Sequence, residues 1–127
     1  ERLSLCYYAG SSYHRLKGLV TVSSGIECEN YERAVSEISA QLEALKAGAW
    51  EVWELQGARS SLLNSLRSIE DSAGAMEDFI LGQTISGLKE TVPDLIEAIG
   101  SVTGARIQAA AQALTLDTIY FLKGKET

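Results

Sequence analysis

Residues 3–27 read LSLCYYAGSSYHRLKGLVTVSSGIE, and two strand-like runs within this stretch determine the expected fold. Side chains alternate with period two over residues 3–9 and again over residues 19–24, where β-branched residues are frequent. Between these runs, residues 10–15 (GSSYHR) have the composition of a turn. A connection this short favours an antiparallel pair, so we predict a β-hairpin.

The first predicted helix follows the hairpin directly. Asn30 is expected to cap its free backbone N–H groups, and apolar residues then recur at spacings of three and four. Gly48 can supply the left-handed residue that ends this helix. A second helix is predicted over about residues 50–69, with its own apolar stripe.

Three shorter helices are predicted in the C-terminal half. Ser72 is a suitable cap for the third helix, which should end near Gly87. Thr91 and Asp94 have the spacing of a capping box with Asp in place of Glu, which predicts the start of a fourth helix. Thr103 is expected to cap the fifth helix.

The closing residues 115–124 (TLDTIYFLKG) are again strand-like, because they are rich in β-branched and aromatic side chains. Strands and helices are thus segregated along the chain, which predicts an α+β fold: an antiparallel sheet of about three strands with about five helices on one face. We expect residues 1–127 to form a single domain fragment. The chain starts almost within a strand, and its only methionine is Met76, so we also expect it to be cut from a longer protein.

The composition excludes several classes of function. The chain of 127 residues has a net charge of −6, which argues against a nucleic-acid surface, where clustered basic residues are needed. No apolar run approaches the length of about 20 residues that crosses a bilayer, so no membrane partner is expected. Cys6 and Cys28 are interpreted as reduced thiols of a cytoplasmic protein, with Cys6 buried in the first strand.

Residues able to perform catalysis are sparse. His14 is the only histidine, so two-histidine zinc motifs are absent, and we interpret His14 as a surface residue. No glycine-rich phosphate loop and no nucleophile elbow occurs. The acidic pairs Glu70–Asp71 and Glu77–Asp78 are interpreted as favourable charge near a helix N-terminus rather than as an acid–base pair.

Aromatic residues mark possible contact surfaces. Trp50 and Trp53, at the start of the second predicted helix, indicate an apolar contact or an interface. On composition alone, Tyr7 and Tyr8 are core or rim residues. The residues by themselves therefore predict an α+β domain without catalytic machinery of its own.

Three stretches resemble one protein family: ERLSLCYYAGSSYHRLKGLVTVSSGIE, LLNSLRSIEDSAGAMEDFILGQ and LIEAIGSVTGARIQAAAQALTLDTIYFLKG. They are similar to the C-terminal part of bacterial zinc peptidases of the insulinase/pitrilysin family, which are relatives of the mitochondrial processing peptidase subunits. Members of that family combine a catalytic domain, which carries an inverted H-x-x-E-H zinc motif, with a metal-free domain that closes over the substrate. The resemblance covers nearly the whole chain and implies the later portion of a metal-free half.

The resemblance implies specific roles for this chain. It would be a non-catalytic C-terminal segment that encloses a peptide substrate and contacts the catalytic domain or a partner subunit. Zinc would be held only by the catalytic domain of the parent or partner, so no cofactor is expected in this fragment. Family members carry an Arg followed seven residues later by a Tyr, and this pair clamps the peptide on its backbone carbonyl side. Tyr7 matches that Tyr, whereas the Arg would fall one residue before Glu1. Tyr7 is therefore the predicted substrate-binding residue.

A binding module without any peptidase link is the alternative. It would use Trp50, Trp53 and an open strand edge to assemble with another protein. Exposed sheet edges also pair readily with a second copy, so we predict a homo-oligomer formed through the first or second strand.

Overall fold

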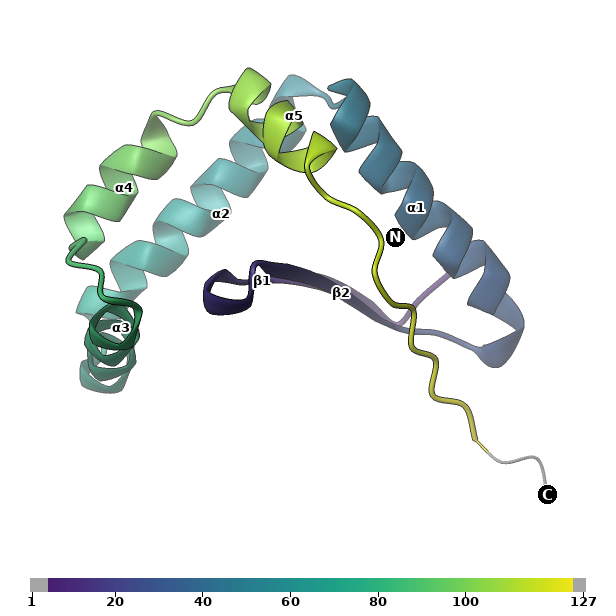
Figure 1. The fold of residues 1–127 in the computed structure, drawn as a ribbon, viewed down its shortest axis with the longest axis horizontal. Coiled ribbons are helices and arrows are strands. Elements are labelled where there is room, and N and C mark those ends of the chain that lie inside the picture. The colour runs from purple at the N-terminus through teal and green to yellow at the C-terminus, as the bar shows by residue number, and fades with distance from the viewer. Residues whose placement is uncertain (1–4, 125–127) are drawn as a thin grey trace.

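Residues 5–124 are described by the structure, which is a computed structural model, and they adopt the predicted α+β class (Figure 1). The helices arch over one side of a β-hairpin (Figure 1). The described elements are β1 (Tyr8–His14), η1 (Arg15–Lys17), β2 (Leu19–Gly25), η2 (Cys28–Asn30), α1 (Tyr31–Ala47), α2 (Val52–Glu70), α3 (Ala73–Ser86), α4 (Val92–Gly100) and α5 (Gly104–Gln112), where η denotes a short 3₁₀ turn.

The predicted hairpin is confirmed, but its first strand lies further along the chain than expected. β1 and β2 are antiparallel, with Tyr8 opposite Gly25 and His14 opposite Leu19. The serine-rich residues 10–14 were predicted to form a turn, yet they pair with the β-branched run of β2. Cross-strand partners of high β-propensity outweigh local turn composition here. The chain reverses through η1 and Gly18, whose φ of 58° is a left-handed value that favours glycine.

The prediction that Cys6 is buried is wrong. Cys6 and Cys28 are both free thiols and both are exposed. Cys6 precedes the first residue of β1, so it lies outside the paired ladder. All residues of β1 are exposed, so a position in or beside this strand does not bury a side chain.

Helix α1 begins and ends as predicted, although its N-terminal cap differs. Asn30 precedes the helix without making a side-chain cap bond, because it ends the η2 turn with φ −90° and ψ 3° instead of extended angles. Its carboxamide oxygen accepts a hydrogen bond from Arg33 Nη1 at 3.4 Å. At the other end, Gly48 adopts the predicted left-handed conformation with φ 75°.

The caps of the later helices follow the sequence closely. Ser72 Oγ accepts from the Ala75 N–H, and Thr103 Oγ1 accepts from the Arg106 N–H. Thr91 and Asp94 form the predicted reciprocal capping box at the start of α4. Within residues 5–124, none of the helices combines the length and the apolar character that crossing a bilayer requires.

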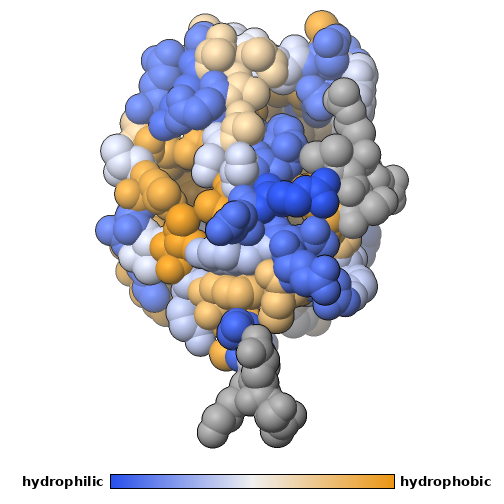
Figure 2. All heavy atoms as spheres, turned by 90° about the vertical axis from the view of Figure 1, so that its right-hand side faces the viewer, coloured by the Kyte–Doolittle hydropathy of each residue, from blue (hydrophilic) through white to orange (hydrophobic). Residues whose placement is uncertain are grey.

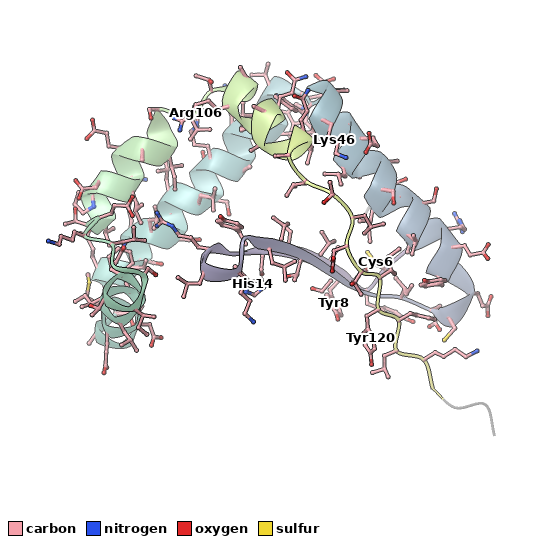
Figure 3. All side chains as sticks on the ribbon, in the orientation of Figure 1. Cys6, Tyr8, His14, Lys46, Arg106 and Tyr120 are labelled. Carbon is pink, nitrogen blue, oxygen red and sulfur yellow. The ribbon has the colours of Figure 1, made fainter. Side chains whose placement is uncertain are left out.

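The helices pack mainly against one another. α2 contacts α3 and α4, and α1 contacts α5. The end of α1 is tied to α5, because Gln108 and Gln112 both donate to the carbonyl oxygen of Lys46, which Figure 3 labels beside α5. Arg59 of α2 reaches the Val102 carbonyl that precedes α5, with 2.5 Å between nitrogen and oxygen. These bonds join segments that lie 43 to 66 residues apart.

The buried core of the described residues is small. It consists of Ala34, Val92 and Ala111, which come from α1, α4 and α5. Many larger apolar side chains of the hairpin, of α2 and α3, and of the closing segment stay exposed. Figure 2 shows hydrophobic residues at the surface on one face of the molecule. Exposure on this scale is typical of surfaces that contact another part of a larger body.

The closing segment differs from its prediction as a third strand. Residues 115–124 have no regular secondary structure and pair with no strand of the described chain, so the sheet has two strands where about three were expected. The Phe121 ring stacks on Tyr31, with 4.4 Å between ring centroids and 27° between ring planes. β-Propensity alone cannot make a strand without a partner to hydrogen-bond with.

Candidate functional site

Tyr7 lies where the two ends of the hairpin meet. Its backbone N–H donates to the Gly25 carbonyl oxygen at 2.7 Å, immediately before the ladder of β1 and β2 begins. Its hydroxyl donates a hydrogen bond to a carboxylate oxygen of Glu27, just after β2. Tyr7 is 76% exposed, so its phenol stands on the surface although its backbone N–H and its hydroxyl are both hydrogen-bonded.

The carboxylate of Glu27 changes the acid–base behaviour of Tyr7. The hydrogen bond to Glu27 raises the pKa of the Tyr7 phenol above its usual value, and the negative charge of Glu27 and slight desolvation act in the same direction. The phenol is therefore neutral over the physiological pH range. Because its proton is directed to Glu27, the remaining lone pairs of the oxygen can accept a hydrogen bond, for example from a peptide N–H. To clamp a peptide carbonyl, the hydroxyl would have to turn away from Glu27.

Tyr8 and His14 lie on the same face of the hairpin. The register places both on the face that also carries Gly10 and Ser12, since they are separated by even numbers of residues. Figure 3 shows Tyr8 and His14 on the side of the hairpin away from the arch of helices. The Tyr8 ring lies over Gly25, where an added Cβ would come within 2.4 Å of it. This pairing of an aromatic ring with a cross-strand glycine was not predicted, although it could be found once the register is known.

The lone histidine behaves as the surface residue that the sequence predicted. His14 is exposed, and its Nε2 lies 3.2 Å from the hydroxyl oxygen of Thr21 on the neighbouring strand. No group of three or more His, Cys, Asp or Glu residues in the range 5–124 is placed to hold a metal ion. Of the acidic pairs, Glu70 and Asp71 lie at the end of α2, directly before the cap of α3. Glu77 and Asp78 lie within α3 beyond its first turn, which contains no acidic residue, so the prediction that they lie near a helix N-terminus is wrong.

The two tryptophans have separate environments. Trp50 packs on the N-terminus of α5, where a Cβ at Gly104 would come within 3.2 Å of its ring, so Trp50 serves the helix packing. Trp53 is 69% exposed at the start of α2, and its neighbour Val52 is also exposed. Trp53 is therefore free to contact another molecule, whereas Trp50 is occupied within the chain.

A shallow cleft of about 490 Å³ separates the tip of the hairpin from α3. Its apolar lining includes Leu16 of η1 and Phe79 of α3. At its edge, Arg15 forms an exposed ion pair with Glu90 at 3.0 Å, which links the hairpin tip to the segment before α4. Exposed pairs of this kind stabilise by at most about 1 kcal/mol. The Oε1 atom of Gln83 also lies here, buried and without a hydrogen-bond partner among the described residues.

Comparison with known proteins relates the chain to metalloprotease-like proteins. It is 36% identical over 126 residues to the protein of Bacillus subtilis (strain 168) described as "Probable inactive metalloprotease YmfF". The alignment includes 99% of this chain but only 30% of that protein, so the chain spans less than a third of the length of its curated relative. No family model matches the sequence.

A solved structure shares the fold described above. The crystal structure of a conserved protein from Enterococcus faecalis V583 aligns with a TM-score of 0.75 and 31% sequence identity. This likeness covers 87% of the present chain and 26% of the other. In that protein, the same arrangement of hairpin and helices therefore forms one part of a much longer chain.

Proposed function

We propose that this chain is the non-catalytic C-terminal segment of a metallopeptidase-like protein of the insulinase/pitrilysin class. The observation that carries the proposal is its 36% identity, over 126 residues, to a probable inactive metalloprotease. The segment would help to enclose a peptide substrate and would contact the catalytic half or a partner subunit. The exposed apolar residues on several elements support a role in contact with a larger body.

Tyr7 is the proposed substrate-binding residue. Its exposed phenol is oriented by Glu27 and stands at the open end of the hairpin, where an extended peptide has room to approach. A neutral phenol whose proton is already donated offers an acceptor for a peptide N–H. Loss of the hydroxyl should therefore weaken peptide binding without altering the hairpin.

Zinc, in this proposal, belongs to the catalytic domain of the parent or partner and not to this segment. Purified chain, loaded with zinc and then dialysed, should retain no stoichiometric metal by elemental analysis, and it should not cleave peptides. One tightly held zinc ion per chain would contradict the proposal. We also propose a cytoplasmic location, for which the two free thiols are the support.

Peptide binding is the direct test of the role of Tyr7. In the longest chain encoded with these residues, Tyr7→Phe should weaken the binding of a fluorescent peptide library about tenfold, as loss of a hydrogen bond of about 1.4 kcal/mol would. Tyr13→Phe is the matched control, because Tyr13 is an exposed tyrosine of β1, the strand that directly follows Tyr7. Equal affinities for all three proteins would contradict a role for the Tyr7 hydroxyl.

A stand-alone interaction module remains the second candidate, and the exposed Trp53 favours it. The sequence encoded before Glu1 distinguishes the two functions. An Arg immediately upstream and several hundred residues of similar α+β pattern support the peptidase-like protein. A start codon close to Glu1 supports the module.

A further inference from the structure

The closing segment, residues 115–122, has the properties of a strand that lacks its neighbour. Its residues are β-branched or aromatic at most positions, and its backbone forms neither a helix nor a paired strand among the described residues. No backbone hydrogen bond joins it to another described residue; the last such bond before it runs from the Leu114 N–H to the Ala111 carbonyl. A single apolar strand without a hydrogen-bonded neighbour is not stable in water.

Residues 115–120 are all exposed, and over residues 119–122 the exposure alternates from one residue to the next. The side chains of Leu116, Tyr120 and Leu122 are 70%, 81% and 79% exposed, whereas Ile119 is 47% exposed and Phe121 is only partly exposed. Phe121 is held against Tyr31 at the start of α1 by ring stacking. The segment therefore contacts the rest of the fold through Phe121, and its backbone makes no hydrogen bond to any other of residues 5–124.

The hairpin is incomplete in the same way. A two-stranded sheet is marginal in water unless further strands or a packed face support it. Tyr13, Val20 and Val22 lie on one face of the hairpin by their register, and all three are exposed. The sheet-forming parts of the chain thus expose apolar side chains and unpaired strand edges together.

If residues 1–127 belong to a longer metallopeptidase-like chain, as proposed above, we infer that residues 115–122 are a β-strand in it and pair with a strand from outside residues 1–127 of that same chain. The relatives identify this occupant. The chain matches only 30% of its Bacillus relative and 26% of the solved Enterococcus chain, yet the shared fold has a TM-score of 0.75. A long remainder is thus present in both relatives, covalently joined to this fold. Its local concentration exceeds that of a second molecule.

Hydrogen exchange measures this pairing without any change to the sequence. In the isolated chain, the amides of residues 115–122 should exchange close to the rate of an unfolded peptide, because they are unpaired. In the longest chain encoded with these residues, the same amides should exchange at least about 100-fold more slowly. Rapid exchange in both chains would overturn the inference. Protection of the isolated chain that grows with concentration, alongside a dimer mass, would also overturn it, since the partner would then be a second copy.

Proline variants supply an independent measurement. Adjacent N–H groups of a strand point to opposite edges, so either Thr118→Pro or Ile119→Pro must remove a ladder bond if one edge is paired. At least one should reduce protection of the segment about tenfold in the longer chain, and neither should change the stability of the isolated chain. Thr118→Ala and Ile119→Ala are the controls, because they keep both N–H groups. Equal protection in all four variants would overturn the inference.

These outcomes are separable from a failure of the proposed function. If the encoded chain proves no longer than these 127 residues, both the proposed function and the inference fail. If it is long and binds peptide through Tyr7 but leaves residues 115–122 unprotected, only the inference fails. If the encoded chain is long and protects residues 115–122 but does not bind peptide, the proposed role fails and the strand pairing stands.

Discussion

The side-chain amide of Gln108 in α5 donates a hydrogen bond to the backbone carbonyl oxygen of Lys46 in the last turn of α1, across 3.1 Å. The final carbonyls of a helix lack partners within the helix, so this oxygen needs a donor from elsewhere. Gln112, one turn further along α5, donates to the same oxygen, also at 3.1 Å. Two amides of one helix therefore cap the end of another and fix how α1 and α5 dock.

Replacement of these amides should loosen the docking of α5. Gln108→Ala should lower the free energy of unfolding by about 1 kcal/mol, since the bond is partly buried. Gln112→Ala should cost less, because its bond is exposed. The double variant should lose more than the sum, because only then is the Lys46 carbonyl left without either donor. Urea denaturation monitored by circular dichroism measures all three, and strictly additive losses would contradict shared capping of one oxygen.

Local signals in the sequence predicted most of the helical part of this fold. The caps at Ser72, Thr91 and Thr103 and the left-handed residue at Gly48 all lie where the sequence placed them. Each depends on a few neighbouring residues, which is why sequence alone sufficed. The cap expected at Asn30 failed, because the preceding 3₁₀ turn holds its backbone away from the extended angles that capping requires.

The hairpin and the closing segment were harder to predict because their structure depends on partners distant in sequence. The strand run over residues 10–14 follows from pairing with β2, and not from its serine-rich composition. The strand expected at the chain's end finds no neighbour within residues 5–124. Contact between Tyr7 and Glu27 likewise needs the hairpin register, since 20 residues separate them in the chain. Tyr7 was singled out only through a family resemblance.

The Tyr7–Glu27 contact predicts an elevated phenol pKa. Ultraviolet titration at alkaline pH should show one tyrosine that ionises above the usual value of about 10, because ionisation would break the bond to a carboxylate and bring two negative charges together. Glu27→Gln should bring this titration back toward the usual value. Tyr7→Phe should remove it, which identifies the residue.

The same contact sets the direction of a pH effect on stability. The folded pKa of Tyr7 is raised, so the contribution is fully present below the unfolded pKa of about 10 and is lost as pH rises through the folded pKa. Between about pH 8 and pH 11, the melting temperature should therefore fall less steeply in Tyr7→Phe than in the parent chain. Identical pH profiles would mean that the hydroxyl and Glu27 are not bonded in solution.

The lowered pKa of Asp94 should make stability depend on pH in the opposite direction, and at acidic pH. The Thr91 hydroxyl and N–H donate to Asp94 Oδ2 at 2.7 and 2.8 Å and hold the pKa of this carboxyl below its usual value. A lowered folded pKa stabilises the protein above the unfolded pKa of about 3.9 and loses that contribution as pH falls through the folded value. Asp94→Asn should therefore flatten the melting temperature between about pH 5 and pH 2. Asp78→Asn, an exposed α3 carboxylate, is the control, and an equal change in both variants would contradict the capping box.

Ala111 tests whether the small core determines the docking of α5. It is one of three buried apolar residues in the described chain, and it belongs to the helix that packs on α1. Ala111→Leu inserts a larger side chain at a buried position and should destabilise the fold by about 1–3 kcal/mol. Ala110→Leu introduces the same side chain at the neighbouring exposed position and should change stability by less than about 0.5 kcal/mol. Denaturant unfolding compares the pair directly, and if the two variants proved equally stable, the close approach of α5 to α1 in this structure would be wrong.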